Sequence, residues 1–185
     1  MRAGMAEPEA LTTLNVREQW QAAFPHLQPA YDQLAADEVF SENGIPGLYF
    51  LVDMLFAHYI ELLLRLRMSH GRDAALHAAF TFVDRLLTSP DDSVIGLGQI
   101  GIIEGREPWW FQRAFPFGSP IFNKHARRVG DLGWEAATKA LSILPVPPVD
   151  YHDLFGIREC IVQLLHAEGV TLAHLPDPSD RTSRA

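Results

Sequence analysis

The feature that most constrains the fold of this chain is an apolar stretch from about residue 47 to 68. Large apolar side chains recur there at steps of three and four residues, at Leu48, Leu51, Val52, Leu55, Tyr59, Leu62, Leu63 and Leu66. That spacing matches the turn of an α-helix. Because the apolar side chains fall on more than one side, we predict that this helix is buried at the centre of the protein.

The same stretch is long enough to cross a bilayer, but polar residues interrupt it. Asp53, His58 and Glu61 fall near its middle, where an ionised carboxylate would be costly in lipid. The N-terminal residues also lack the apolar segment of a secretory signal. We therefore expect a cytoplasmic protein that makes no membrane contact.

Amphipathic patterns of the same spacing follow one another along most of the chain. They lie at about residues 15–24, 29–39, 74–88, 92–104, 120–144 and 152–168. Gly130 and Gly133 should bend or split the fifth pattern, because glycine weakens a helix. Strand signals are nearly absent: no run alternates with period two, and Asn43-Gly44 stands between helical patterns. We predict an all-α fold, an irregular bundle or short stack of roughly seven to nine helices.

The length and the cysteine content fit one domain in a reducing compartment. We place a single α-helical domain at residues 13–175, between a flexible lead at 1–12 and a polar, disordered tail at 176–185. The one cysteine, Cys160, cannot form an internal disulfide. It sits in an apolar helical pattern, where a buried and unreactive thiol is the ordinary outcome.

The charge is unevenly distributed. The chain carries a net charge of -8, and between Glu18 and Leu64 it has seven acids but no Lys or Arg. From Arg65 to Lys139 the balance reverses, with ten bases against eight acids. An acidic region argues against nucleic acid as a ligand, because phosphates need a concentrated basic face. It favours a basic protein partner, or serves only solubility.

One motif of nucleotide-binding proteins occurs without its context. Residues Gly96 to Gly101 match G-x-G-x-x-G, which binds a pyrophosphate when it follows a buried strand in a βαβ unit. Here the preceding residues, Ser89 to Ser93, have turn chemistry and cannot form such a strand. We interpret the glycines as a small-residue groove that lets another helix pack closely.

No set of residues in the sequence supports a metal site, a cofactor site or a nucleophilic active site. A catalytic zinc needs at least three ligands and a di-iron site needs paired Glu-x-x-His motifs, whereas this chain offers isolated pairs such as His58 with Glu61. His58 and His77 lie on apolar helix faces, where we expect core residues. No Gly-x-Ser-x-Gly elbow is present. We therefore predict a protein that is not an enzyme and binds no cofactor.

Two groups of residues are candidates for contact with a protein partner. The first is the acidic group Asp32, Asp37, Glu38 and Glu42; the second is the aromatic pair Trp109 and Trp110. Aromatic residues dominate interface hot spots, and exposed acids steer basic partners. Each group has a plainer interpretation, a solvated surface for the acids and core packing for the indoles.

Residues 80–104 carry three motifs in succession. Phe80-Thr81-Phe82-Val83-Asp84-Arg85-Leu86-Leu87 is followed by Ser89-Pro90-Asp91-Asp92-Ser93-Val94, and then by Leu97 to Gly101 with Glu104. An aromatic-acid-Leu helix, an Asp-rich turn and a Val-Leu-Gly-Glu helix in this order resemble a segment of small helical bacterial immunity proteins of polymorphic toxin systems. The resemblance implies a cytosolic, non-catalytic protein that binds and neutralises a cognate toxin domain. In charge-complementary pairs of this kind the toxin domain would be basic.

Two other functions remain open. The first is a helical adaptor or homo-oligomeric scaffold that uses the aromatic block, and the chain itself would be a monomer or a homodimer. The second is a helical enzyme or ligand carrier with a cavity between helices, which would use His58, Glu61 or His152.

Overall fold

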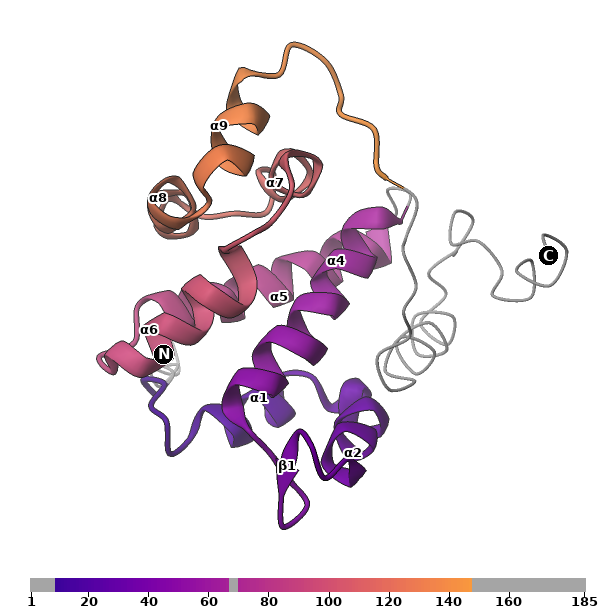
Figure 1. Ribbon diagram of the computed structural model, residues 1–185, viewed down its shortest axis with the longest axis vertical. Helices are drawn as coiled ribbons and strands as arrows, with labels where there is room; N and C mark the ends of the chain where they lie inside the picture. The colour runs from indigo at the N-terminus through magenta and orange to yellow at the C-terminus, as the bar shows by residue number, and fades with distance from the viewer. Residues whose placement is uncertain (1–8, 67–69, 148–185) are drawn as a thin grey trace, which may run out of the picture.

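The computed structural model describes residues 9–66 and 70–147, and in them the chain is almost entirely helical (Figure 1). The first part comprises α1 (Val16–Ala23), η1 (Pro25–Leu27), α2 (Gln28–Ala36), β1 (Ser41–Glu42), β2 (Ile45–Pro46), α3 (Leu48–Phe50), η2 (Leu51–Phe56) and α4 (Ala57–Arg65). The second part comprises α5 (His70–Leu87), α6 (Asp92–Gly96), η3 (Leu97–Ile103), α7 (Pro108–Ala114), α8 (Pro120–Val129) and α9 (Asp131–Lys139). The predicted all-α fold is confirmed.

The apolar stretch forms the central helix of the protein, as predicted. Elements α3, η2 and α4 run on without a break from Leu48 to Arg65. The helix lies between the α1 and α2 side of the molecule and the α5 to α7 side (Figure 1). Leu55 and Ile60 on it are completely buried, because neighbours cover more than one of its faces.

Two aromatic clusters fill the core on either side of α5. In the first, Phe24 lies with its ring centroid 4.9 Å from Phe56 and 5.5 Å from Phe82. In the second, Phe80 lies 5.1 Å from Phe122 and 6.2 Å from Trp110. Because Phe80 and Phe82 are both on α5, this helix joins the two clusters into one core.

Segments η2 and η3 are π-helical, with hydrogen bonds to the fifth residue, and they pack against each other. The close approach occurs at Gly101, where an added Cβ would lie 3.0 Å from Val52 Cγ1. Gly98 on the same segment faces Leu86 and Leu87 of α5. Gly98 and Gly101 of the G-x-G-x-x-G motif therefore serve close helix packing, as the missing strand context indicated, whereas nothing lies within 4 Å of a Cβ added at Gly96.

The predicted split of residues 120–144 is found at Gly130. Helix α8 ends before this residue and α9 begins after it. An added Cβ would lie 2.5 Å from Ala126 O at Gly130, and 2.2 Å from Arg106 O at Gly133. Both positions therefore require glycine, because backbone atoms occupy the space of a side chain.

Of the flexible lead predicted at 1–12, the structure describes residues 9–12, and Leu11 there is packed into the protein. Leu11 is only 1% exposed and belongs to the core. Ser89 donates its hydroxyl proton to Leu11 O at 2.6 Å, and Asp91 accepts the Thr13 N–H at 3.0 Å. The packed domain thus begins before residue 13, because Leu11 fills a core position. The expected helix at 152–168, Cys160, His152 and the tail at 176–185 lie outside the described residues.

Among the residues that the structure describes, no helix is both long enough and apolar enough to span a membrane. Helix α5, which spans 18 residues, carries the charged side chains of Arg72, Asp73, Asp84 and Arg85. The central helix carries the polar residues Asp53, His58 and Glu61 that argued against a transmembrane segment.

Candidate functional site

A β-hairpin that sequence reasoning missed projects from the end of the molecule formed by α1 and α2 (Figure 1). Its strands pair Ser41 with Pro46 and Glu42 with Ile45. Asn43 and Gly44 form the two-residue turn, with φ of 54° and 75°. Positive φ at both central positions is the geometry that Asn-Gly favours in tight hairpins. The prediction that Asn43-Gly44 lies between helices without joining strands was wrong.

Hydrogen bonds and one aromatic contact fix the hairpin to the body of the protein. The Ser41 hydroxyl donates to Ala35 O at 2.7 Å, at the end of α2. Arg17 on α1 donates to Pro46 O at 2.8 Å. The ring of Phe40 meets that of Phe50 edge-on, with centroids 5.0 Å apart. These contacts come from three helices, so the hairpin is held in one orientation before any partner arrives.

Two large apolar side chains are exposed on this rigid element. Val39 is 74% exposed and Ile45 is 49% exposed. Both line a surface hollow of about 580 Å³, together with Glu42 and Phe50. We call the surface formed by Asp37, Glu38, Val39, Glu42 and Ile45 the hairpin face.

The structure places three of the four predicted acidic contact residues on the hairpin face. Glu38 and Glu42 are exposed. Asp37 is half-buried, and its carboxylate accepts the Val39 N–H at 2.8 Å. The fourth, Asp32, is exposed on α2, where it accepts a hydrogen bond from Gln28 at 2.7 Å. Glu42 is paired with Ile45 and lines the same hollow as the exposed apolar pair, as Arg17 also does, and Glu38 precedes Val39 in the chain. Asp37 has a structural role in the turn.

Two other acids of the base-free stretch are half-buried and paired with arginines. Glu61 pairs with Arg65 at 2.7 Å and with Arg106 at 3.9 Å. Asp53 lies 3.7 Å from Arg106, and its negative charge is the main reason that the pKa of Tyr49 is raised. Four of the seven acids of this stretch, Asp32, Asp37, Glu38 and Glu42, thus lie on α2 or between α2 and the hairpin turn, Glu18 is exposed on α1, and Arg17 lines the hairpin hollow.

The structure places Trp109 and Trp110 in the core and not on a partner surface. Trp109 is 5% exposed and Trp110 is 2% exposed. The Trp109 indole N–H donates to Glu107, and the guanidinium of Arg65 lies 4.4 Å from the Trp109 ring centroid. This corrects their assignment as contact residues, because α7 places the Trp109 indole against Arg65 of α4 and the Trp110 indole near Phe80 of α5. The exposed apolar residues of the hairpin face, Val39 and Ile45, were not among the predicted contact residues.

The two histidines expected in the core are both exposed. His58 Nδ1 lies 3.3 Å from Asp53 O, and the His77 ring meets Phe117 with centroids 5.1 Å apart. The expectation that His58 and His77 are buried was wrong, because each lies at the edge of its apolar helix face. Within residues 9–66 and 70–147, no three His, Cys, Asp or Glu side chains are grouped to hold a metal ion.

The residues that resemble the immunity-type segment mainly serve packing in the structure. Phe80, Phe82 and Val83 are buried on α5, and Asp91 caps α6 by accepting the Ser93 N–H. Residues that serve packing carry no information about a partner, so the resemblance to immunity proteins stays a prediction. No protein-family model, curated protein or solved structure matches this chain.

Proposed function

We propose that this chain is a non-catalytic, cytoplasmic protein-binding domain whose hairpin face docks onto a basic protein. The observation that carries the proposal is the exposed pair Val39 and Ile45 on a fixed hairpin, with Glu38 and Glu42 beside it. An apolar centre with a polar rim is the usual anatomy of a protein interface.

The chemistry of the hairpin face favours a partner with basic residues around an apolar cavity. Val39 and Ile45 would bury apolar area on docking, which is the main favourable contribution. Glu38 and Glu42 would raise the association rate by electrostatic steering, an effect that salt screens. Because Ser41, Arg17 and Phe40 already hold the hairpin, little conformational entropy would be lost on binding.

The specific form of the proposal is an immunity protein that neutralises a cognate toxin domain. Two observations support it: the resemblance of residues 80–104, and the acids gathered on a projecting element that could enter the cleft of a basic enzyme. Blocking a cleft needs only a rigid, complementary surface. It requires no catalytic residues in the inhibitor.

The test uses the toxin domain that this proposal expects in the gene next to the one for this chain. Expression of that domain alone should arrest growth, and co-expression of this chain should restore it. The association rate of the purified pair, measured by biolayer interferometry, should be fast at low salt. It should fall at least about tenfold for Glu38→Lys with Glu42→Lys, because two steering charges are reversed. Asp37 is left unchanged since it holds the turn.

The matched control reverses the same number of charges elsewhere. Glu104→Lys with Glu135→Lys changes two exposed acids outside the hairpin face and should leave the association rate nearly unchanged. Equal rates for the two double variants would contradict the proposed surface. Failure of this chain to restore growth would contradict the immunity function. Self-association without binding to the toxin domain would favour a homo-oligomeric scaffold instead.

A further inference from the structure

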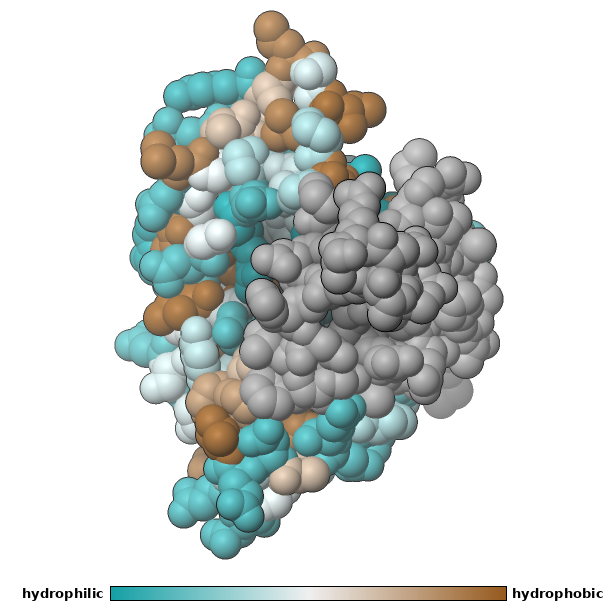
Figure 2. Space-filling model, turned by 45° about the vertical axis from the view of Figure 1, so that its right-hand side comes forward, coloured by the Kyte–Doolittle hydropathy of each residue, from teal (hydrophilic) through white to brown (hydrophobic). Residues whose placement is uncertain are grey.

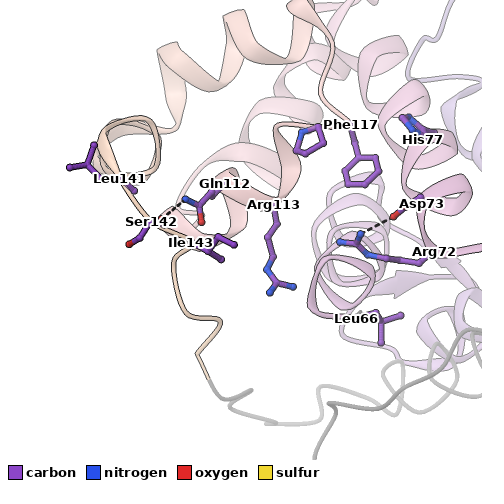
Figure 3. A pocket seen from close by; sticks show the side chains of 12 residues that line it. Leu66, Arg72, Asp73, His77, Gln112, Arg113, Phe117, Leu141, Ser142 and Ile143 are labelled. Carbon is purple, nitrogen blue, oxygen red and sulfur yellow. Dashed lines mark hydrogen bonds and ion pairs between the residues drawn. The ribbon is translucent and has the colours of Figure 1, made fainter. Parts of the chain in front are cut away.

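A second and larger hollow, of about 860 Å³, lies between the start of α5, α7 and the segment that follows α9 (Figure 3). Its size is in the range of small-molecule sites. Leu66, Phe117 and Ile143 form apolar parts of its wall, and Arg72, Arg113 and His77 form polar parts. The hollow is distinct from the hairpin face, since the two share no residue.

The two arginines of this hollow donate hydrogen bonds to carbonyl oxygens at the C-terminal end of α4. Arg72 Nε donates to Leu63 O at 2.9 Å, and Arg113 Nη1 donates to Leu64 O at 2.7 Å. Carbonyls at a helix C-terminus have no partner within the helix, and basic side chains satisfy them well. Each guanidinium has five N–H donors, so this role leaves donors of Arg113 available.

The guanidinium of Arg113 has no acidic partner among the described residues. Asp73 pairs with Arg72 at 2.8 Å, whereas no ion pair found among the described residues includes Arg113. Figure 3 shows the Arg113 side chain extending into the hollow between Ile143 and Arg72. Burial, followed by the charges of Arg72 and Arg65, lowers the pKa of Arg113. An arginine stays protonated even so. An anion in the hollow would offset the repulsion between Arg113 and the charges of Arg72 and Arg65.

The apolar wall of the hollow is open to solvent on the side of the segment after α9. Ile143 is 84% exposed and Leu141 is fully exposed. Figure 2 shows apolar groups gathered on that end of the molecule. Exposed apolar groups next to an unmatched guanidinium complement a ligand that has an anionic head and an apolar body.

We propose that this hollow binds a small amphipathic carboxylate, with its head on Arg113 and its apolar body against Leu66, Phe117 and Ile143. A carboxylate suits the site better than a phosphate does. A single guanidinium can hold a carboxylate through two parallel N–H donors. The nearby carboxylate of Asp73 would repel a second negative charge on the ligand.

Isothermal titration calorimetry of the full chain with octanoate, decanoate and decanol tests the proposal. Each added CH₂ that becomes buried should tighten binding by up to roughly fourfold, so decanoate should bind more tightly than octanoate. Decanol, which has the same chain length without the charge, should bind at least about tenfold more weakly than decanoate. Decyl phosphate should also bind more weakly than decanoate.

Two variants locate the ligand. Arg113→Gln should weaken the binding of decanoate at least about tenfold while changing the binding of decanol little. The control Arg127→Gln removes an exposed arginine of α8 and should have no effect. Because Arg113 also caps α4, Ile143→Asp provides a second variant at an exposed position that leaves the cap intact. It should weaken both ligands.

Three outcomes would overturn the assignment. The first is equal binding of decanoate and decanol to the wild-type chain. The second is unchanged decanoate binding to both Arg113→Gln and Ile143→Asp. The third is tighter binding of decyl phosphate than of decanoate, which would place a phosphate-bearing ligand in the hollow instead.

Discussion

Gly101 lies so close to Val52 that an added Cβ would stand 3.0 Å from the valine Cγ1 and 3.5 Å from the backbone nitrogen of Asp53. This contact is where the two π-helical segments meet. Arg106 reinforces it, because its guanidinium donates to Gly101 O at 2.7 Å and lies 3.7 Å from the Asp53 carboxylate. One residue without a side chain thus sets the distance between the central helix and η3.

Substituting Gly101 by alanine should lower the free energy of unfolding by about 1 to 3 kcal/mol, the usual cost of overpacking a core. Urea denaturation followed by circular dichroism measures it. Val52→Ala in the same chain should recover part of the loss, because it removes the atom that the new methyl group meets. Gly96→Ala is the control: nothing lies within 4 Å of its added Cβ, so it should be neutral or stabilising. Equal effects at the two glycines would contradict the close contact.

Gly44→Ala should destabilise the protein by about 1 to 2 kcal/mol, although no atom lies near the added methyl group. The cause is the backbone, because φ at Gly44 is 75° and side chains other than glycine pay for this conformation. Gly44→Asn should lose less stability than Gly44→Ala, since asparagine tolerates a left-handed backbone better than alanine does. Thermal unfolding of the two variants checks the order. A loss for asparagine as large as that for alanine would be inconsistent with this turn.

The stability that Asp91 contributes should depend on pH. Hydrogen bonds from the backbone N–H of Thr13 and of Ser93 lower the pKa of this carboxyl in the folded protein. A folded-state pKa below the unfolded value means that the contribution is present above the unfolded pKa and disappears as pH falls through the folded one. Urea midpoints of the wild type and Asp91→Ala should therefore differ at pH 7 and converge in acid. Asp91→Asn keeps a capping oxygen and should be less destabilised at pH 7. A constant difference at all pH values would contradict this role.

Ser119→Ala should cost about 0.5 to 2 kcal/mol, because the hydroxyl caps α8 by accepting the N–H groups of Ile121 and Phe122. The same hydroxyl donates to Asp84 at 2.6 Å. Burial raises the pKa of Asp84, and the Ser119 bond limits the rise. In Ser119→Ala the folded-state pKa of Asp84 should rise further. Above that pKa the ionised carboxylate destabilises the fold, so the loss of unfolding free energy becomes smaller as pH falls.

Urea denaturation between pH 4 and 7 separates the two effects of Ser119→Ala. The conservative variant Ser119→Thr keeps a hydroxyl at the cap and should stay near the wild type throughout. If the loss of unfolding free energy in Ser119→Ala does not change with pH, the capping role of Ser119 stands but its effect on the pKa of Asp84 is contradicted.

The helices could be predicted because side-chain spacing reports helical burial directly. Leu51, Leu55 and Leu62 recur as an α-helix requires, and all three are buried. The hairpin could not be found in this way, because strands of two residues are too short to show a period. Its available signal was the Asn-Gly pair, which we set aside for lack of flanking strands. The π-helical character of η2 and η3 has no side-chain signature, since it depends on which carbonyl each N–H reaches.

The candidate sites were predicted only in part, for a different reason. Acids such as Glu38 and Glu42 are exposed in almost any fold, so their role as surface residues followed from their charge. An apolar side chain carries no such information: Trp110 is buried whereas Val39 is exposed. The hollow around Arg113 combines residues from three segments that are distant in sequence. Only the packing of α5, α7 and the segment after α9 brings them together.

The two π-helical segments also determine how this chain would respond to the loss of one residue. An α-helix advances by about 100° for each residue, so removing one residue from a regular turn would rotate everything that follows it by that angle. A π-helical turn instead holds about one residue more than an α-helical turn, so a deletion within Leu51–Phe56 that leaves a regular helix would keep Glu61 of α4 near Arg106. The wide turn is therefore the part of the central helix that can lose one residue while both halves stay in register with their neighbours.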